Sequence, residues 1–103
     1  MKIECKKFGT ILTSRPAGRE AFGAIRAELK PNQERVELDF EGVLAVTPSW
    51  MDEFLSLLLE YVGNGAEILP TNNASVLATL RTLAKAKQEP VASFARRYLE
   101  CQK

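Results

Sequence analysis

The residues with the clearest chemical potential in this 103-residue chain form one short polar segment, Thr47-Pro48-Ser49. Before it runs a stretch of alternating apolar and polar residues, 35–40, and after it a strongly apolar stretch begins at Trp50. A serine at the start of a helix can cap that helix, or it can carry a phosphate, which the free N–H groups and the positive end of the helix dipole favour. The segment therefore predicts either a plain helix cap or a modification site.

Both interpretations of Ser49 stay open on the residues alone. Thr47 before Pro48 fits an N-cap with proline in the first turn, and Ser49 followed by Asp52 fits a weak capping box. A phosphate on Ser49 would also be repelled by the nearby Asp52 and Glu53. The residue chemistry by itself favours capping over phosphorylation.

The remaining reactive residues argue against an enzyme. The chain has no histidine, which excludes Ser-His and Cys-His nucleophiles and the commonest metal ligand. Catalysis by carboxylates alone needs two acids in one cleft. The candidates are Asp39, Glu41, Asp52 and Glu53. Cys5 and Cys101 form no CxxC pair and are predicted to be free thiols, so we expect no catalytic residue, no cofactor and no metal site.

Composition and charge predict one folded domain spanning 1–103, because 46% of the residues are hydrophobic and 26% are charged. Residues 1–80 hold eight Lys/Arg against eleven Asp/Glu, and residues 81–103 hold six against two. Six cations spread over two helices make a weak case for nucleic acid. No apolar run has the length of a signal peptide or a membrane span, so we expect a soluble cytoplasmic protein without a membrane partner; a homodimer stays possible.

Hydrophobic periodicity predicts strands and helices in alternation. Strands are expected at residues 2–7, 35–40 and 66–70, and 9–14 is expected to extend the first strand or pair with it. Helices are expected at residues 14–30, 48–63, 71–88 and about 90–101. The pattern indicates an α/β fold, in which helices pack on a small mixed sheet and sites form in strand-to-helix loops.

Helix 48–63 is the predicted core helix, because apolar residues nearly encircle it and leave one polar stripe, which contains Asp52 and Glu53. Its Trp50 is either a core residue, which we favour, or an exposed interface anchor. Arg15 and Arg19 begin the preceding helix, where cations oppose the helix dipole. They are solvated surface charges, or candidates for pairing with a partner or an anion.

The order of these segments carries a resemblance to a known family. The stretch LDFEGVLAVTPSWMDEF, preceded by GREAFGAIRAEL and followed by GAEILPTNNASVLATLRTL, resembles the STAS-like domains over residues 9–87. These are relatives of the bacterial anti-sigma-factor antagonists and of the cytoplasmic domains of sulfate transporters. In the antagonists the elbow is similar to D-S-S-G, which places Ser49 at the serine that a partner kinase phosphorylates, Thr47 at an aspartate and Trp50 at a glycine.

The resemblance implies a β-α-β-α-β-α order, here with an extra C-terminal helix, and a non-enzymatic regulatory function. It implies docking through Thr47, Ser49, Trp50 and Glu53 onto a histidine-kinase-like ATP-binding partner, with phosphorylation at Ser49 dissociating the pair. The replacements at positions 47, 48 and 50 place the chain nearer to the divergent STAS-like group, whose activity is not established. Two alternatives remain, namely a small-ligand or anion-binding domain that uses the elbow, and a small enzyme subunit with Asp39 or Glu41 as base.

Overall fold

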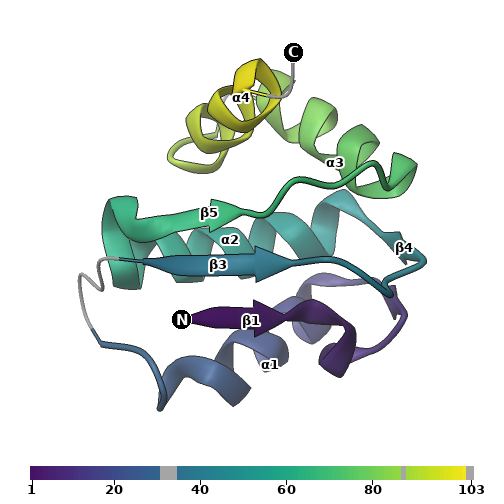
Figure 1. The fold of residues 1–103 in the computed structure, drawn as a ribbon. Coiled ribbons are helices and arrows are strands. Elements are labelled where there is room, and N and C mark those ends of the chain that lie inside the picture. The colour runs from purple at the N-terminus through teal and green to yellow at the C-terminus, as the bar shows by residue number, and fades with distance from the viewer. Residues whose placement is uncertain (31–34, 87, 102–103) are drawn as a thin grey trace.

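The computed structural model describes residues 1–30, 35–86 and 88–101, and these fold into strands with helices packed against them (Figure 1). The strands are β1 Lys2–Glu4, β2 Ile11–Leu12, β3 Val36–Asp39, β4 Ala45–Val46 and β5 Ala66–Ile68. The α-helices are α1 Arg15–Arg26, α2 Pro48–Val62, α3 Ala74–Lys85 and α4 Val91–Cys101, and short 3-10 helices span Cys5–Phe8 and Gly63–Gly65. The predicted α/β class, strand-helix order and C-terminal helix are confirmed.

The strands form two separate parallel sheets, where we had expected one mixed sheet. The main sheet has the order β1-β3-β5, with Ile3 opposite Leu38 and Leu38 opposite Ile68. Strand β2 pairs with β4 and neither extends β1 nor pairs with it. The 3-10 helix at Cys5–Phe8 separates β1 from β2, because it turns the chain away from the main sheet and buries Cys5.

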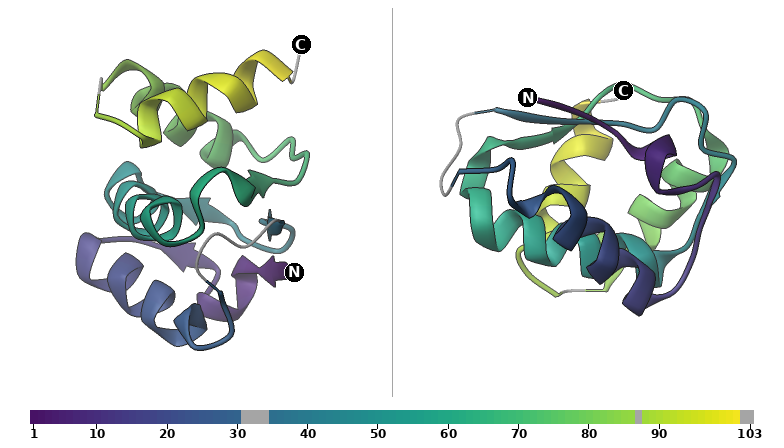
Figure 2. Two further views of the ribbon diagram at one scale, coloured as in Figure 1. Left: turned by 90° about the vertical axis from the view of Figure 1, so that its left-hand side faces the viewer. Right: turned by 90° about the horizontal axis from the view of Figure 1, so that it is seen from below.

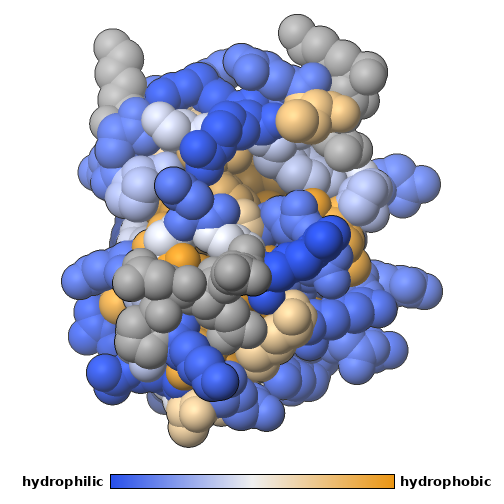
Figure 3. Space-filling view, turned by 60° about the vertical axis from the view of Figure 1, so that its left-hand side comes forward, coloured by the Kyte–Doolittle hydropathy of each residue, from blue (hydrophilic) through white to orange (hydrophobic). Residues whose placement is uncertain are grey.

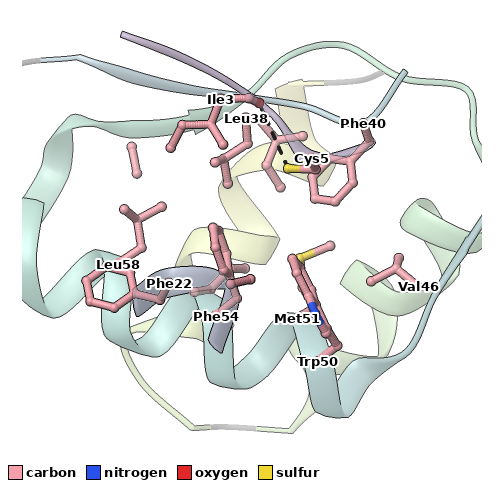
Figure 4. Close-up of a cluster of buried hydrophobic side chains, with 14 of the residues drawn as sticks. Ile3, Cys5, Phe22, Leu38, Phe40, Val46, Trp50, Met51, Phe54 and Leu58 are labelled. Carbon is pink, nitrogen blue, oxygen red and sulfur yellow. Dashed lines mark hydrogen bonds between the residues drawn. The ribbon is translucent and has the colours of Figure 1, made fainter. Parts of the chain in front are cut away.

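Helix α2 packs its apolar surface against the main sheet, as predicted for the core helix (Figure 4). Phe54 and Leu58 point toward the strands, and Trp50 stacks on Phe54 with ring centroids 4.8 Å apart. The helix ends at Gly63, whose φ of 67° is a left-handed conformation that glycine adopts without strain. This core fixes the direction in which the first turn of α2 leaves the sheet.

Helices α1 and α2 lie side by side on one face of the main sheet (Figure 2). Ser14 caps α1 by accepting a hydrogen bond from the Ala17 N–H. Gly18 allows close contact between the helices, since a Cβ built there would lie 2.6 Å from the Trp50 carbonyl oxygen. The absence of a side chain at position 18 thus brings the start of α1 against the start of α2.

Helices α3 and α4 form a hairpin beyond the β5 edge (Figure 1). Phe94 and Val91 of α4 are buried, whereas Cys101 is exposed. In the parts of the chain that the structure describes, no helix combines the length and the apolar character that crossing a membrane requires.

Candidate functional site at the strand-to-helix elbow

The elbow follows β4, a strand that the sequence did not predict. The expectation that the chain runs directly from the strand at 35–40 into α2 is therefore wrong. After β3 the chain turns at Phe40, whose carbonyl accepts from the Val43 N–H, and Gly42 takes a φ of 89°. The next residues then form β4, which pairs with β2. The elbow therefore belongs to the small second sheet, which we call the ribbon (β2 and β4).

Side chains of α3 take the place of a further strand along the ribbon. Ala45 and Thr47 donate their N–H groups to β2 and the residue before it, so the Val46 backbone faces the other way. There the Val46 N–H donates to the Ser75 hydroxyl (2.9 Å), and the Val46 carbonyl accepts from Ser75 (3.1 Å) and Thr79 (2.9 Å). These bonds fix β4 one residue before the elbow.

Asn73 holds both sides of this junction. Its side-chain oxygen caps α3 by accepting from the N–H groups of Ser75 and Val76, and its amide nitrogen donates to the Val43 carbonyl at 2.7 Å. Asn72, Asn73 and Ser75 all have side chains that could cap this helix. Asn73 is the cap, and Ser75 instead bonds to Val46.

In the first turn of α2, one residue caps the helix and a different residue carries the exposed hydroxyl. Thr47 is the N-cap, because its hydroxyl accepts from the Trp50 N–H at 3.4 Å, and Pro48 begins the helix. Ser49 is therefore not the cap. Its side chain is exposed, and no described residue hydrogen-bonds to its hydroxyl. The residue that the resemblance selects is thus free for a reaction or a contact.

Trp50 points away from Ser49 and into the core, where only 1% of it is exposed. Its ring also lies 6.2 Å from that of Phe8. The expectation that Trp50 binds a partner is wrong, because an indole packed between Phe8 and Phe54 offers no surface to another protein. The alternative of Trp50 as a core residue is the one that the coordinates support.

An ion-pair network joins the start of α1 to the first turn of α2. Arg15 donates to Asp52 at 2.7 Å and lies 3.7 Å from Glu53, and Arg19 lies 3.0 Å from Glu53. The hydrogen bond to Asp52 raises the pKa of Arg15. Asp52 is 8% exposed, although the sequence placed it on a solvated stripe, because the Arg15 guanidinium covers it. Both arginines therefore pair within the chain.

A small cleft of about 220 Å³ adjoins Ser49. Arg15, Ser49 and Asp52 line one side of it, and Leu83 and Val91 of the α3–α4 hairpin line the other. The cleft thus places the hydroxyl next to one cation and one carboxylate.

Two large apolar side chains are exposed at the ribbon, Ile11 of β2 (63%) and Leu44 (71%), which directly precedes β4. Their backbones lie close together in space, because the Leu44 N–H donates to the carbonyl of Thr10, the neighbour of Ile11. Sequence reasoning missed them, since an isolated leucine before an unpredicted strand carries no periodic signal. Exposed apolar groups beside a polar elbow are typical of a protein-binding surface.

The carboxylates proposed as bases lie elsewhere. Asp39 and Glu41 follow β3 and line a cavity of about 520 Å³ with residues 70–72. The Glu41 N–H, which donates to the Asp39 carboxylate, and Lys2, 3.4 Å away, lower the pKa of Asp39. A general base at neutral pH needs the opposite shift.

Residues 18–73 match the family model of the STAS-like domain of unknown function, DUF4325. The match extends from α1 to the cap of α3 and includes the whole elbow. The chain belongs to this STAS-like family. No curated protein and no solved structure matches the chain. The match ends at Asn73, so both α3 and α4 lie outside the matched residues.

Proposed function

We propose that this STAS-like domain is a non-enzymatic regulatory module that docks through its elbow onto a histidine-kinase-like ATP-binding partner in the cytosol. The observation that carries the proposal is the exposed Ser49 hydroxyl at the start of α2, on the segment that follows β4, with Ile11 and Leu44 exposed at the strand pair before it. The docking surface that we propose consists of Thr47, Ser49 and Glu53 with these two apolar residues. Apolar side chains of this size, when buried by a partner, supply the energetic centre of a small interface.

Phosphorylation of Ser49 is the proposed switch. The partner transfers the γ-phosphoryl group of its ATP, so the bond from phosphorus to ADP breaks, a bond to the Ser49 oxygen forms, and the hydroxyl proton is released. The phosphate brings nearly two negative charges beside Asp52 and Glu53. Arg15 already pairs with both carboxylates, so the added charge is only partly compensated and repels an acidic partner surface.

The test combines the purified domain with a histidine-kinase-like ATP-binding regulator from the same organism, with and without ATP. We expect a complex without phosphorylation, phosphate on Ser49 by peptide mass spectrometry, and dissociation of the phosphorylated form by size-exclusion chromatography. Ser49→Ala should bind but accept no phosphate. Ser56→Ala, on the same helix, is the matched control and should behave as the wild type. Absence of a complex, or phosphate transfer that Ser49→Ala leaves intact, contradicts the proposal.

The apolar pair gives a second, independent measurement. The double variant Ile11→Ser/Leu44→Ser should lower partner affinity about 30-fold, since each of the two anchors contributes on the order of 1 kcal/mol. Its free energy of unfolding should change little, because both side chains are already in solvent. Equal affinity of the double variant and the wild type would remove the ribbon from the docking surface.

An anion site at the elbow is the second candidate, and the cleft between Arg15 and Ser49 favours it. Two carboxylates already occupy Arg15, however, and Thr47 occupies the Trp50 N–H. This reduces the positive field available to an anion. A rise in melting temperature with phosphate that is lost in Arg15→Ala, without any partner, would favour this alternative.

A further inference from the structure

Strand β5 is an edge of the main sheet, and one side of its backbone faces away from the other strands. The Leu69 N–H donates to the Leu38 carbonyl at 2.9 Å, so residues in this register bond toward β3. Because backbone groups alternate in direction along a parallel strand, the N–H and C=O groups of Ala66 and Ile68 point to the outer side. In the described part of the chain no residue pairs with them.

A groove of about 430 Å³ lies between this unpaired edge, where Ala66 and Ile68 are 9% and 5% exposed, and helix α4. Ala66 and Ile68 line the strand side, and Phe94, Arg97 and Tyr98 of α4 line the helix side. The residues on α4 stand three and four positions apart, so one face of the helix looks along the strand. Figure 3 shows hydrophobic side chains at the bottom of a recess beneath the uppermost helical layer.

The groove has one closed end. The Tyr98 hydroxyl accepts from the Thr71 N–H at 3.1 Å and donates to the Leu69 carbonyl at 3.4 Å. These bonds satisfy the chain just after β5, where Pro70 offers no donor of its own. The unpaired edge is therefore confined to the three residues of β5, which span about 10 Å.

The lining of the groove contains one residue of each charge, Glu67 and Arg97. Glu67 of β5 pairs with Arg35 at 3.2 Å, whereas no described carboxylate lies within ion-pair distance of Arg97. The segment 81–103 that contributes α4 is also the basic part of the chain, with six Lys/Arg against two Asp/Glu. A carboxylate in the groove would thus pair with Arg97 without displacing an existing partner.

We propose that this groove binds an extended acidic peptide segment of a partner protein as a fourth strand of the main sheet. The peptide backbone pairs with Ala66 and Ile68, alternate apolar side chains contact Phe94 and Tyr98, and a carboxylate binds Arg97. Main-chain pairing supplies affinity and the side-chain contacts supply selectivity, as in other cases of strand addition. The site shares no residue with the elbow cleft and does not depend on the proposed function.

A second copy of the chain fits this edge less well than a peptide does. Two-fold pairing of β5 with another β5, centred on Glu67, would bring Arg97 of one copy near Arg97 of the other, whereas a peptide carboxylate would meet an opposite charge at Arg97. Like charges directly opposite one another destabilise a strand pair. Charge complementarity therefore favours an acidic segment over self-association.

Cys101 gives the site a built-in reporter, because it lines the groove and is exposed. The other thiol, Cys5, is buried, and burial raises its pKa to about 12, so it stays protonated and unreactive at neutral pH. The rate of iodoacetamide alkylation therefore reports on Cys101 alone. A peptide in the groove should slow it in proportion to the occupied fraction.

The experiment uses the full chain and hexapeptides in which every position is Val, Ile, Thr, Tyr, Asp or Glu. We expect acidic, β-branched members to bind and to slow alkylation of Cys101. Arg97→Glu should weaken a selected peptide about fivefold. Arg81→Glu, the same charge change on the exposed side of α3, should have no effect.

Backbone pairing is tested with N-methyl groups on alternate residues of the selected peptide. Methyl groups along one edge should abolish binding, and methyl groups along the other edge should leave it intact, because only one edge pairs with β5. Three results overturn the proposal: no hexapeptide slows alkylation, both methylated peptides bind equally, or Cys101 is protected by self-association that sedimentation detects without peptide.

Discussion

The main sheet and the ribbon use the same parallel pairing, but they differ in what their apolar side chains contact. In the main sheet Ile3, Leu38 and Ile68 are all buried against the helices. In the ribbon Leu12 and Val46 are buried, whereas Ile11 and Leu44 stay in solvent. The difference indicates that the main sheet contributes most of the folding free energy, while the ribbon leaves apolar area that a partner can cover.

The largest expected effect tests this division directly. Leu38→Ala should lower the free energy of unfolding by about 2–5 kcal/mol, because it leaves a cavity under α2. Leu44→Ala should change it by less than about 0.5 kcal/mol, since that side chain is 71% exposed. Urea unfolding of both variants measures the difference. Similar losses would mean that the ribbon supports the fold as much as the main sheet does.

A second pair of substitutions sharpens the comparison at the helix layer. Gly18→Ala should cost about 1–3 kcal/mol, because the added methyl group would clash with the Trp50 carbonyl oxygen. Gly23→Ala, in the same helix, should instead stabilise by about 0.5–1 kcal/mol, since nothing lies within 4 Å of the new Cβ. Thermal unfolding distinguishes the two. Equal melting temperatures would contradict the close approach of α1 and α2.

The ion pair beneath the elbow should have an intermediate effect. Arg15→Ala leaves the mostly buried Asp52 without its cation and should cost about 1–2 kcal/mol, while Arg19→Ala should cost less than about 0.5 kcal/mol. Chemical denaturation of both variants measures the difference. In the double variant Arg15→Ala/Asp52→Asn part of the loss should be recovered, and a strictly additive result would show that the two groups do not interact.

The smallest effect concerns pH at the end of β3. The pKa of Asp39 is lowered in the folded state, so its contribution to stability is present above the unfolded pKa of about 4 and is lost as pH falls through the folded value. Asp39→Asn should therefore make unfolding between pH 5 and pH 2 less dependent on pH than in the wild type. Glu41→Gln is the neighbouring control, and an identical acid response of wild type and Asp39→Asn would contradict this assignment.

Much of the fold was predictable because its elements are long enough to show a period. Helix α2 is recognisable by apolar residues on nearly every side, and in β3 the apolar residues Val36 and Leu38 alternate with polar ones. The two-residue strands β2 and β4 have no such signal, since two positions define no alternation. The separation into two sheets was therefore invisible in the sequence.

The elbow was predictable in type but not in detail. Pro48 fixed the helix start, and Thr47 was a named cap candidate. The burial of Asp52 was not predictable, because it depends on Arg15, 37 residues earlier. The role of Ser75 was not predictable either, because its hydroxyl could cap α3 but bonds to Val46 instead. Long-range side-chain pairing decides such positions, and local patterns do not record it.

The hydroxyl groups of Ser75 and Thr79 have a consequence for self-assembly. By saturating the outer backbone groups of Val46, they leave β4 without a free edge on which another chain could polymerise. A double change of these hydroxyls to alanine and valine would expose that edge beside Ile11 and Leu44, and fibrillar deposits nucleated at the ribbon are the expected result.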